Sequence, residues 1–165
     1  TGVASSHHLN GEQLNMLAGM QTVHIPYKNS PVADTAAGIL PLTHVILVQA
    51  MPFIKAGKVK ALAITSDRRS RLLPDVPPVA EHGIPEYNYT TWMGFSGPRG
   101  TPPEVISRLN GWFVQVAKMP DIIQNLEADG SEVVGSTPAQ FQQQILSEVA
   151  RWNKVVKEAG IKAEE

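Results

Sequence analysis

The sequence contains no cysteine, and this absence removes several kinds of chemistry at once. Disulfide bonds, thiolate metal sites and cysteine nucleophiles are excluded, although the cellular compartment stays open. No apolar run approaches the roughly 20 residues that a membrane-spanning helix needs. A basic excess is also lacking, because 14 Lys and Arg residues stand against 15 Asp and Glu residues. Nucleic acid is therefore not a favoured partner.

The first residues lack the features of an export signal, since no basic segment precedes an apolar stretch. The chain also begins without methionine, so we expect a processed or truncated product. With 42% hydrophobic and 18% charged residues the chain is predicted to be globular, and 13 Gly and 13 Pro indicate many element boundaries. A length of 165 residues suits one ordinary domain or two small lobes.

The first section of the chain alternates predicted strands and short helices. In residues 22–27, Val23, Ile25 and Tyr27 alternate with His24, which predicts a strand with one buried face, and a polar elbow follows. Further strands are expected over residues 42–48 and 59–65, with helices over residues 8–18, 32–37, 51–56 and 79–82. Such alternation predicts a small parallel α/β unit.

The second section is mostly helical and follows an extended segment expected over residues 87–96. Thr101-Pro102-Pro103-Glu104 and Thr137-Pro138-Ala139-Gln140 both have the cap, proline and acidic or amide residue of a helix start. Helices are predicted from these two starts and over residues 121–128, with a short strand at 132–134. Their apolar stripes contain Val105, Leu109, Trp112 and Val116, and then Phe141, Ile145, Val149, Trp152 and Val156. Part of the sheet that these helices cover is expected in missing sequence or in another chain.

Several catalytic readings lack support in the spacing of residues. His7 and His8 diverge on a helix, the other three histidines show no ligand spacing, and metal binding is not expected. No G-x-S-x-G elbow marks a serine nucleophile, so a hydrolase is a minor alternative. Asp34 could be a base, or it could be a solvated or capping carboxylate.

Two predicted helix starts are compatible with a bound anion. Ser5-Ser6-His7-His8 and Ser30-Pro31-Val32 each offer hydroxyl groups and backbone N–H groups at the positive end of a helix dipole. Such a start suits a carboxylate and needs no lysine. Ordinary N-capping remains the alternative reading of both.

A series of ordered motifs resembles one known family. These motifs are Gly2-Val3-Ala4-Ser5-Ser6-His7-His8-Leu9, His24-Ile25-Pro26-Tyr27-Lys28, Ile54-Lys55-Ala56-Gly57-Lys58-Val59-Lys60-Ala61-Leu62-Ala63-Ile64-Thr65-Ser66, Leu73-Pro74-Asp75-Val76-Pro77-Pro78-Val79-Ala80-Glu81, Trp92-Met93-Gly94-Phe95 and Gly100-Thr101-Pro102-Pro103. Together they resemble the Bug (Bordetella uptake gene) proteins, the extracytoplasmic solute receptors of tripartite tricarboxylate transporters. The resemblance runs essentially from end to end.

The resemblance implies an α/β fold of the type II periplasmic-binding-protein class, with one nearly complete lobe, a hinge return and the C-terminal helices of the other lobe. Residues 1–90 would form the second ligand-binding lobe. Residues 91–165 would contain the hinge strand and the helical part of the first lobe, whose N-terminal part is absent. A periplasmic receptor without cofactor is implied, which captures a small carboxylated solute and delivers it to a membrane permease. A self-associating α/β module without ligand is the alternative.

The resemblance also implies a set of ligand-binding residues. They are Ser5, Ser6, His7 and His8 at the first helix start, Ser30 in the elbow and Trp92 at the hinge return. Three departures put the identity of the ligand in question. Ala4 replaces a usual glycine, residues 29–31 replace a more glycine-rich elbow, and the segment over residues 45–51 is shorter than in the family.

Overall fold

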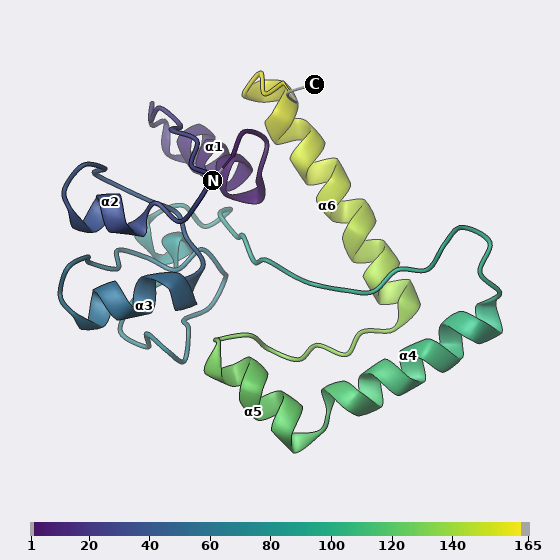
Figure 1. The fold of residues 1–165 in the computed structure, drawn as a ribbon. Helices are drawn as coiled ribbons and strands as arrows, with labels where there is room; N and C mark the ends of the chain where they lie inside the picture. Colours follow the sequence, from purple (N-terminus) through teal and green to yellow (C-terminus); the bar gives the residue numbers. More distant parts are fainter. Residues whose placement is uncertain (1, 163–165) are drawn as a thin grey trace. The chain divides into compact units, whose positions relative to one another are not determined.

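A computed structural model describes residues 2–162 and divides them into two compact units (Figure 1). The first unit contains the chain up to Thr90 together with the part from Trp152 onward, and the second unit is Thr91–Arg151. The helices are α1 (Ser6–Ala18), α2 (Val32–Ala36), α3 (Leu47–Lys55), the 3-10 helix η1 (Val79–His82), α4 (Pro103–Ala117), α5 (Pro120–Ala128) and α6 (Pro138–Glu158).

Helix α1 ends where the sequence predicts, and it begins two residues earlier than the expected residue 8. Ser5 is the N-cap in extended backbone, and its side chain accepts a hydrogen bond from the backbone N–H of His8. Gly19 closes the helix at a φ of 63°, a left-handed conformation that glycine adopts without steric cost. The buried face differs from the expected one, because Asn10, Gln13 and Asn15 are buried whereas Met16 and Leu17 are exposed.

The buried side chains of the described residues all lie in the first unit. They are Val32, Ala50, Tyr87, Tyr89 and Val155, the prolines Pro31 and Pro78, and the three polar residues of α1. Tyr89 donates its backbone N–H to the carbonyl of Thr65 over 2.8 Å, and its ring meets Trp152 edge to face at 5.7 Å. Residues 87–89 thus fasten the extended segment after η1 to the core of this unit.

The predicted strands do not form in the part of the chain that the structure describes. Residues 22–27, 59–65 and 132–134 contain no β-ladder, and Ile64–Pro78 and Ser70–Leu73 are isolated bridges. The expected buried face of residues 22–27 is also wrong, since Val23 is 83% exposed and Ile25 is 52% exposed. Alternation predicts extended backbone, but a strand exists only where a neighbour pairs with its N–H and C=O groups.

The strand expected over residues 42–48 is wrong for a second reason. Leu47 and Val48 are already the first turn of α3, which runs to Lys55 and buries Ala50. A short apolar run cannot be assigned to a strand or a buried helix by periodicity alone. Helix α3 lies beside α2, and its end confirms the predicted stop near residue 56.

The second unit contains α4, α5 and the first part of α6, with α4 beside α5. The capping box of α6 is confirmed: Gln140 donates its backbone N–H to the Thr137 hydroxyl, and the Gln140 side chain accepts from the Thr137 N–H at 2.9 Å. The cap predicted for α4 is wrong, because Pro102 occupies the N-cap and the Thr101 hydroxyl donates to the carbonyl of Pro98.

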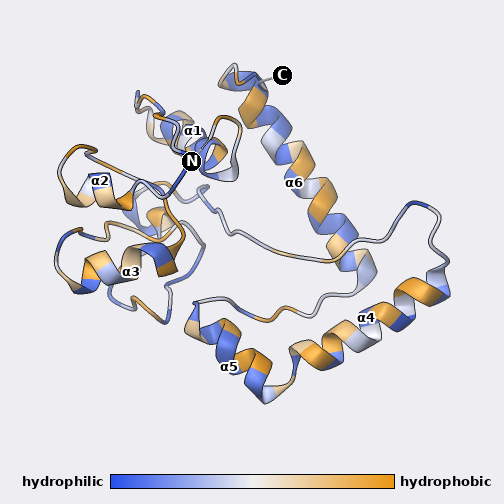
Figure 2. Ribbon diagram, in the orientation of Figure 1, coloured by the Kyte–Doolittle hydropathy of each residue, from blue (hydrophilic) through white to orange (hydrophobic). Residues whose placement is uncertain are grey.

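Figure 2 shows apolar residues along α4, and within the described residues most of this apolar stripe is exposed. Val105 is 40% exposed, Trp112 53% and Val116 49%, so the prediction of a buried stripe is wrong for this chain. Aromatic contacts give this unit its internal packing. Phe95 stacks on Phe113 with ring centroids 4.3 Å apart, and Trp92 meets Phe141 edge to face at 5.2 Å.

Candidate functional site: the start of helix α1

The start of α1 is a tight turn that ends in a well-formed helix cap. Ala4 has a φ of 56° and is the one non-glycine residue of the described chain at positive φ. Ser5 donates its backbone N–H to the carbonyl of Gly2, and its hydroxyl caps the N–H of His8 at 3.3 Å. Ser6 is exposed and starts the helix. The first-turn N–H groups and the helix dipole give this end a positive potential.

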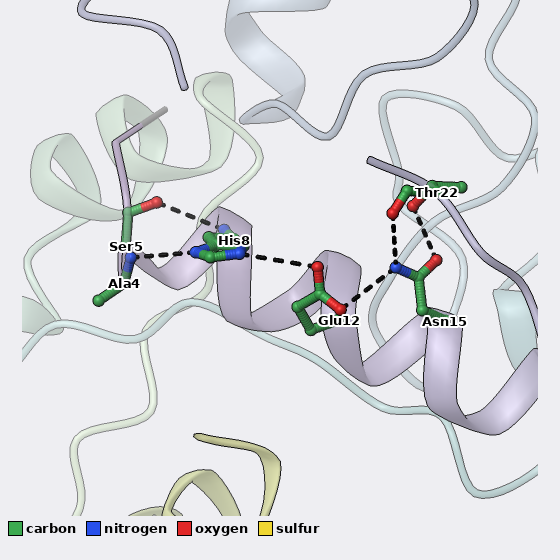
Figure 3. Close-up of polar contacts among 6 residues, drawn as sticks. All are labelled: Ala4, Ser5, His8, Glu12, Asn15 and Thr22. Carbon is green, nitrogen blue, oxygen red and sulfur yellow. Dashed lines mark hydrogen bonds and ion pairs between the residues drawn. The ribbon is translucent and has the colours of Figure 1, made fainter. Parts of the chain in front are cut away.

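The His8 side chain is held on three sides, and Figure 3 shows two of these contacts, those with Ala4 and Glu12. Its Nδ1 accepts the backbone N–H of Ala4 at 3.0 Å, and its Nε2 lies 3.6 Å from Oε1 of Glu12. Its ring stacks on His24, with centroids 3.8 Å apart and planes 11° from parallel. Figure 3 shows that the contacts continue along α1, where Asn15 donates to Glu12 at 3.3 Å.

A second polar group lies beneath the helix start. Asn10 is 2% exposed, and its Oδ1 accepts a hydrogen bond from the hydroxyl of the fully buried Tyr87. The Asn10 Nδ2 lies 3.5 Å from Nδ1 of His44. Because Nδ2 can only donate, this contact requires an unprotonated Nδ1 on His44. Two segments far along the chain thereby support the first turns of α1.

Burial lowers the pKa of three histidines in this region. Burial is the largest cause for His7, His8 and His44. The charge of His7 lowers the pKa of His44 further. His8 also feels His24, which lowers its pKa, and Glu12, which raises it. We call His7, His8, His24 and His44 the α1 histidine cluster.

The α1 histidine cluster is not arranged as a metal site. Among the described residues no group of three or more His, Asp or Glu side chains is placed to hold a metal ion. His8 and His24 also meet face to face, whereas metal ligation needs the ring nitrogens to point at one common centre. The cluster is therefore suited to hydrogen bonding and to electrostatic control of the helix start.

The elbow before α2 differs from the predicted cap. Pro31 occupies the N-cap of α2 without a side-chain hydrogen bond, and Ser30 Oγ is shielded from solvent with no hydrogen-bond partner in the described part of the chain. Asp34 accepts a 2.6 Å hydrogen bond from the hydroxyl of Tyr27, which raises the pKa of that phenol. A buried hydroxyl without a partner is uncommon, so the Ser30 hydroxyl is a candidate to bind a ligand.

The structure brings Ser5, Ser6, His7 and His8 together at one helix start and places Ser30 elsewhere in the same unit. Trp92 belongs to the second unit, where it is 39% exposed beside a shallow hollow lined by residues 92–95. Sequence reasoning missed the remaining members of this region, which are His24, His44, Asn10 and Tyr87. The one sequence signal for His24 was its place opposite Val23 and Ile25 in the alternation.

Sequence comparison gives a consistent assignment. Residues 1–161 match the family model of the tripartite tricarboxylate transporter family receptor. Protein BugT of Bordetella pertussis is 33% identical over 162 residues, which are 97% of this chain and 50% of BugT. The chain therefore spans about half the length of that relative.

Solved structures show the same fold. The Rhodopseudomonas palustris protein Rpa4515 with adipate has a TM-score of 0.79 and 34% identity, covering 95% of this chain and 53% of that one. The periplasmic binding protein BugD has a TM-score of 0.77 and 29% identity, covering 97% and 55%. MatC from the same organism as Rpa4515, with bound malate, has a TM-score of 0.70 and 29% identity, covering 92% and 53%.

These likenesses confirm the α/β periplasmic-binding-protein fold class, of which this chain is a helix-rich part. No helix in the described part is both long and apolar enough to cross a membrane. The ordered motifs, the family model that extends over residues 1–161 and the structural likeness agree, and the chain belongs to the receptor family of the tripartite tricarboxylate transporters.

Proposed function

We propose that this chain is part of an extracytoplasmic receptor that captures a small carboxylate-bearing solute and delivers it to the permease of a tripartite transporter. The observation that carries the proposal is the pair of structural relatives that hold adipate and malate. Both ligands are dicarboxylates, so the shared chemistry is an anionic carboxylate at each end of a short carbon chain. The family is one of receptors, which favours binding over catalysis.

The start of α1 is the proposed carboxylate site. A carboxylate there would receive hydrogen bonds from the first-turn N–H groups and the hydroxyls of Ser5 and Ser6, at the positive end of a 13-residue helix. His7 and His8 would border the site, Ser30 would supply its shielded hydroxyl, and Trp92 would contribute an apolar surface. Two lobes that close on the solute by hinge motion would divide its recognition between them.

The same proposal assigns the parts of the chain to lobes. Residues 1–90 would be the second lobe, and residues 91–165 would contain the hinge return and the C-terminal helices of the first lobe. The half-length coverage of the relatives and the exposed apolar stripe of α4 support this assignment, because such a stripe needs a surface to cover. The remaining part of the first lobe would be that surface, and the periplasm would be the site of action.

Ligand binding can be tested on the chain itself by calorimetry and by amide NMR. Adipate and malate are titrated beside adipamide, which has the carbon skeleton of adipate without its charges. We expect weak binding of the two acids, because on this proposal the rest of the first lobe would supply half of the cleft, and we expect the shifts to centre on the amides of residues 5–8. Ser5→Ala should weaken it, whereas Ser147→Ala, an exposed serine on α6, should not.

Three results would contradict the proposal. Micromolar affinity in this chain alone would mean that the site is complete without the remaining part of the first lobe. Equal response to adipate and adipamide would remove the role of the carboxylate. Shifts distributed away from residues 5–8 would place the site elsewhere.

A further inference from the structure

The imidazole of His8 accepts a hydrogen bond that only its neutral form can accept. Nδ1 takes the backbone N–H of Ala4 at 3.0 Å, so it must carry a lone pair, and the ring proton belongs on Nε2. Nε2 faces Oε1 of Glu12 at 3.6 Å, the side on which a proton is stabilised. Protonation would place an N–H on Nδ1 directly against the N–H of Ala4.

This hydrogen bond holds the turn that precedes the helix. Ala4 lies at a φ of 56°, in a region that is unfavourable for a non-glycine residue, so the conformation requires support from its surroundings. His8 supplies that support from both ends. Its side chain accepts from Ala4, while its backbone N–H donates to the Ser5 hydroxyl. The position of His8 therefore sets the direction of residues 4 and 5.

The groups that face His8 come from several segments. Glu12 on α1 is the acidic one, fixed by Asn15, and it favours the charged ring. His24 stacks on the ring face at 3.8 Å and opposes a positive charge on His8. Burial is the largest effect, and the balance lowers the pKa of His8. His8 is thus neutral at pH 7 and gains a proton only on acidification.

We propose that His8 is a positioning residue whose neutral ring holds the start of α1 in its carboxylate-binding geometry, and that protonation of the ring releases this turn and weakens dicarboxylate binding. The inference rests on the proposed function above. The direction of the pH effect separates two roles of His8. A histidine that contacted the carboxylate directly would bind it more tightly when protonated, whereas the positioning role predicts weaker binding.

Two variants of His8 separate the hydrogen bond from the charge. His8→Asn offers an amide oxygen near the position of Nδ1 but has no titrating group. His8→Phe keeps a flat ring against His24 and has no acceptor. His82→Asn, on the exposed surface of η1, is the matched control. Adipate affinity is measured for each variant by calorimetry between pH 5.5 and 8.

We expect wild type and the His82→Asn control to lose affinity as the pH falls and the His8 ring gains a proton, by about threefold to tenfold in total, the range that corresponds to one lost hydrogen bond. At pH 8 His8→Asn should bind adipate more tightly than His8→Phe, and it should lose the part of the acid dependence that exceeds the protonation of adipate itself. His8→Phe lacks the acceptor at every pH, so it should bind more weakly than the wild type at pH 8 and show no acid dependence beyond that of adipate itself. A wild-type affinity that rises on acidification, or wild-type pH dependence in His8→Asn, would overturn the proposal.

Nitrogen-15 NMR without ligand tests the positioning role independently of binding. The amide of Ala4 should titrate together with Nδ1 of His8 in the wild type and stay unchanged with pH in His8→Asn. If the chemical shift of the Ala4 amide does not change as His8 titrates, the positioning role of His8 is refuted, even if adipate binds. If no carboxylate binds at any pH, the proposed function fails, while the Ala4 titration still decides whether His8 holds the turn.

Discussion

Replacing Gly94 with alanine tests how the second unit is packed. A Cβ at this position would lie 2.7 Å from Cε2 and 2.9 Å from Cε1 of Phe141, well inside the ordinary contact distance between carbon atoms. The Phe141 ring lies on Gly94 and meets Trp92 edge to face at 5.2 Å. Alanine can therefore be accommodated only if the ring shifts and the aromatic pair loosens.

The expected cost follows from these contacts. Overpacking of this kind destabilises by roughly 1–3 kcal/mol, and loss of an aromatic pair alone accounts for about 0.5–1.5 kcal/mol. For a chain of this length each kcal/mol lowers the melting temperature by about 2–4 °C. The matched control is Gly111→Ala in the interior of α4, where a Cβ meets nothing within 4 Å. That change should stabilise by roughly 0.5–1 kcal/mol.

Thermal unfolding followed by circular dichroism measures both variants, and near-ultraviolet ellipticity reports on Trp92. A Phe141→Leu background should reduce the cost of Gly94→Ala, because the smaller side chain makes room for the methyl group. The reasoning is refuted if Gly94→Ala melts with the wild type while Gly111→Ala shows the expected gain. It is also refuted if the cost is the same in the Phe141→Leu background.

Three further predictions concern the first unit. Ala4→Gly should raise the free energy of unfolding by about 0.5–1 kcal/mol in urea titrations, because it relieves the positive φ of 56°, whereas Ala37→Gly at a φ of −84° should lower it by a similar amount. Tyr87→Phe should cost roughly 1–3 kcal/mol, since the buried Asn10 loses a donor, and an unchanged urea midpoint would contradict this. The lowered pKa values of His7, His8 and His44 predict stability that is complete above the ordinary value of 6.5 and declines as the pH falls below it, because the unfolded chain binds more protons there; melting temperatures that rise between pH 7 and 5.5 would contradict the sign.

The helices were largely predictable because their signals are local. Ser5 and Gly19 mark the ends of α1, and Thr137 with Gln140 marks the start of α6, each through hydrogen bonds or backbone conformations that span only a few residues. The strands were not, because alternation such as that of residues 22–27 describes a backbone but not its partner. In the described chain those segments stay extended, and the ladders they would need are absent.

The candidate site divides in the same way. The sequence by itself determined the helix start with its serines and adjacent histidines, since capping depends on residues three or four positions apart. Only the tertiary structure decided that His24 stacks on His8, that His44 lies against Asn10, and that the Tyr87 hydroxyl donates a hydrogen bond to Asn10. These partners are 16 to 77 residues apart, and no periodicity within one element relates positions so distant. The arrangement that favours a neutral His8 at the helix start therefore follows from the tertiary structure and not from the sequence alone.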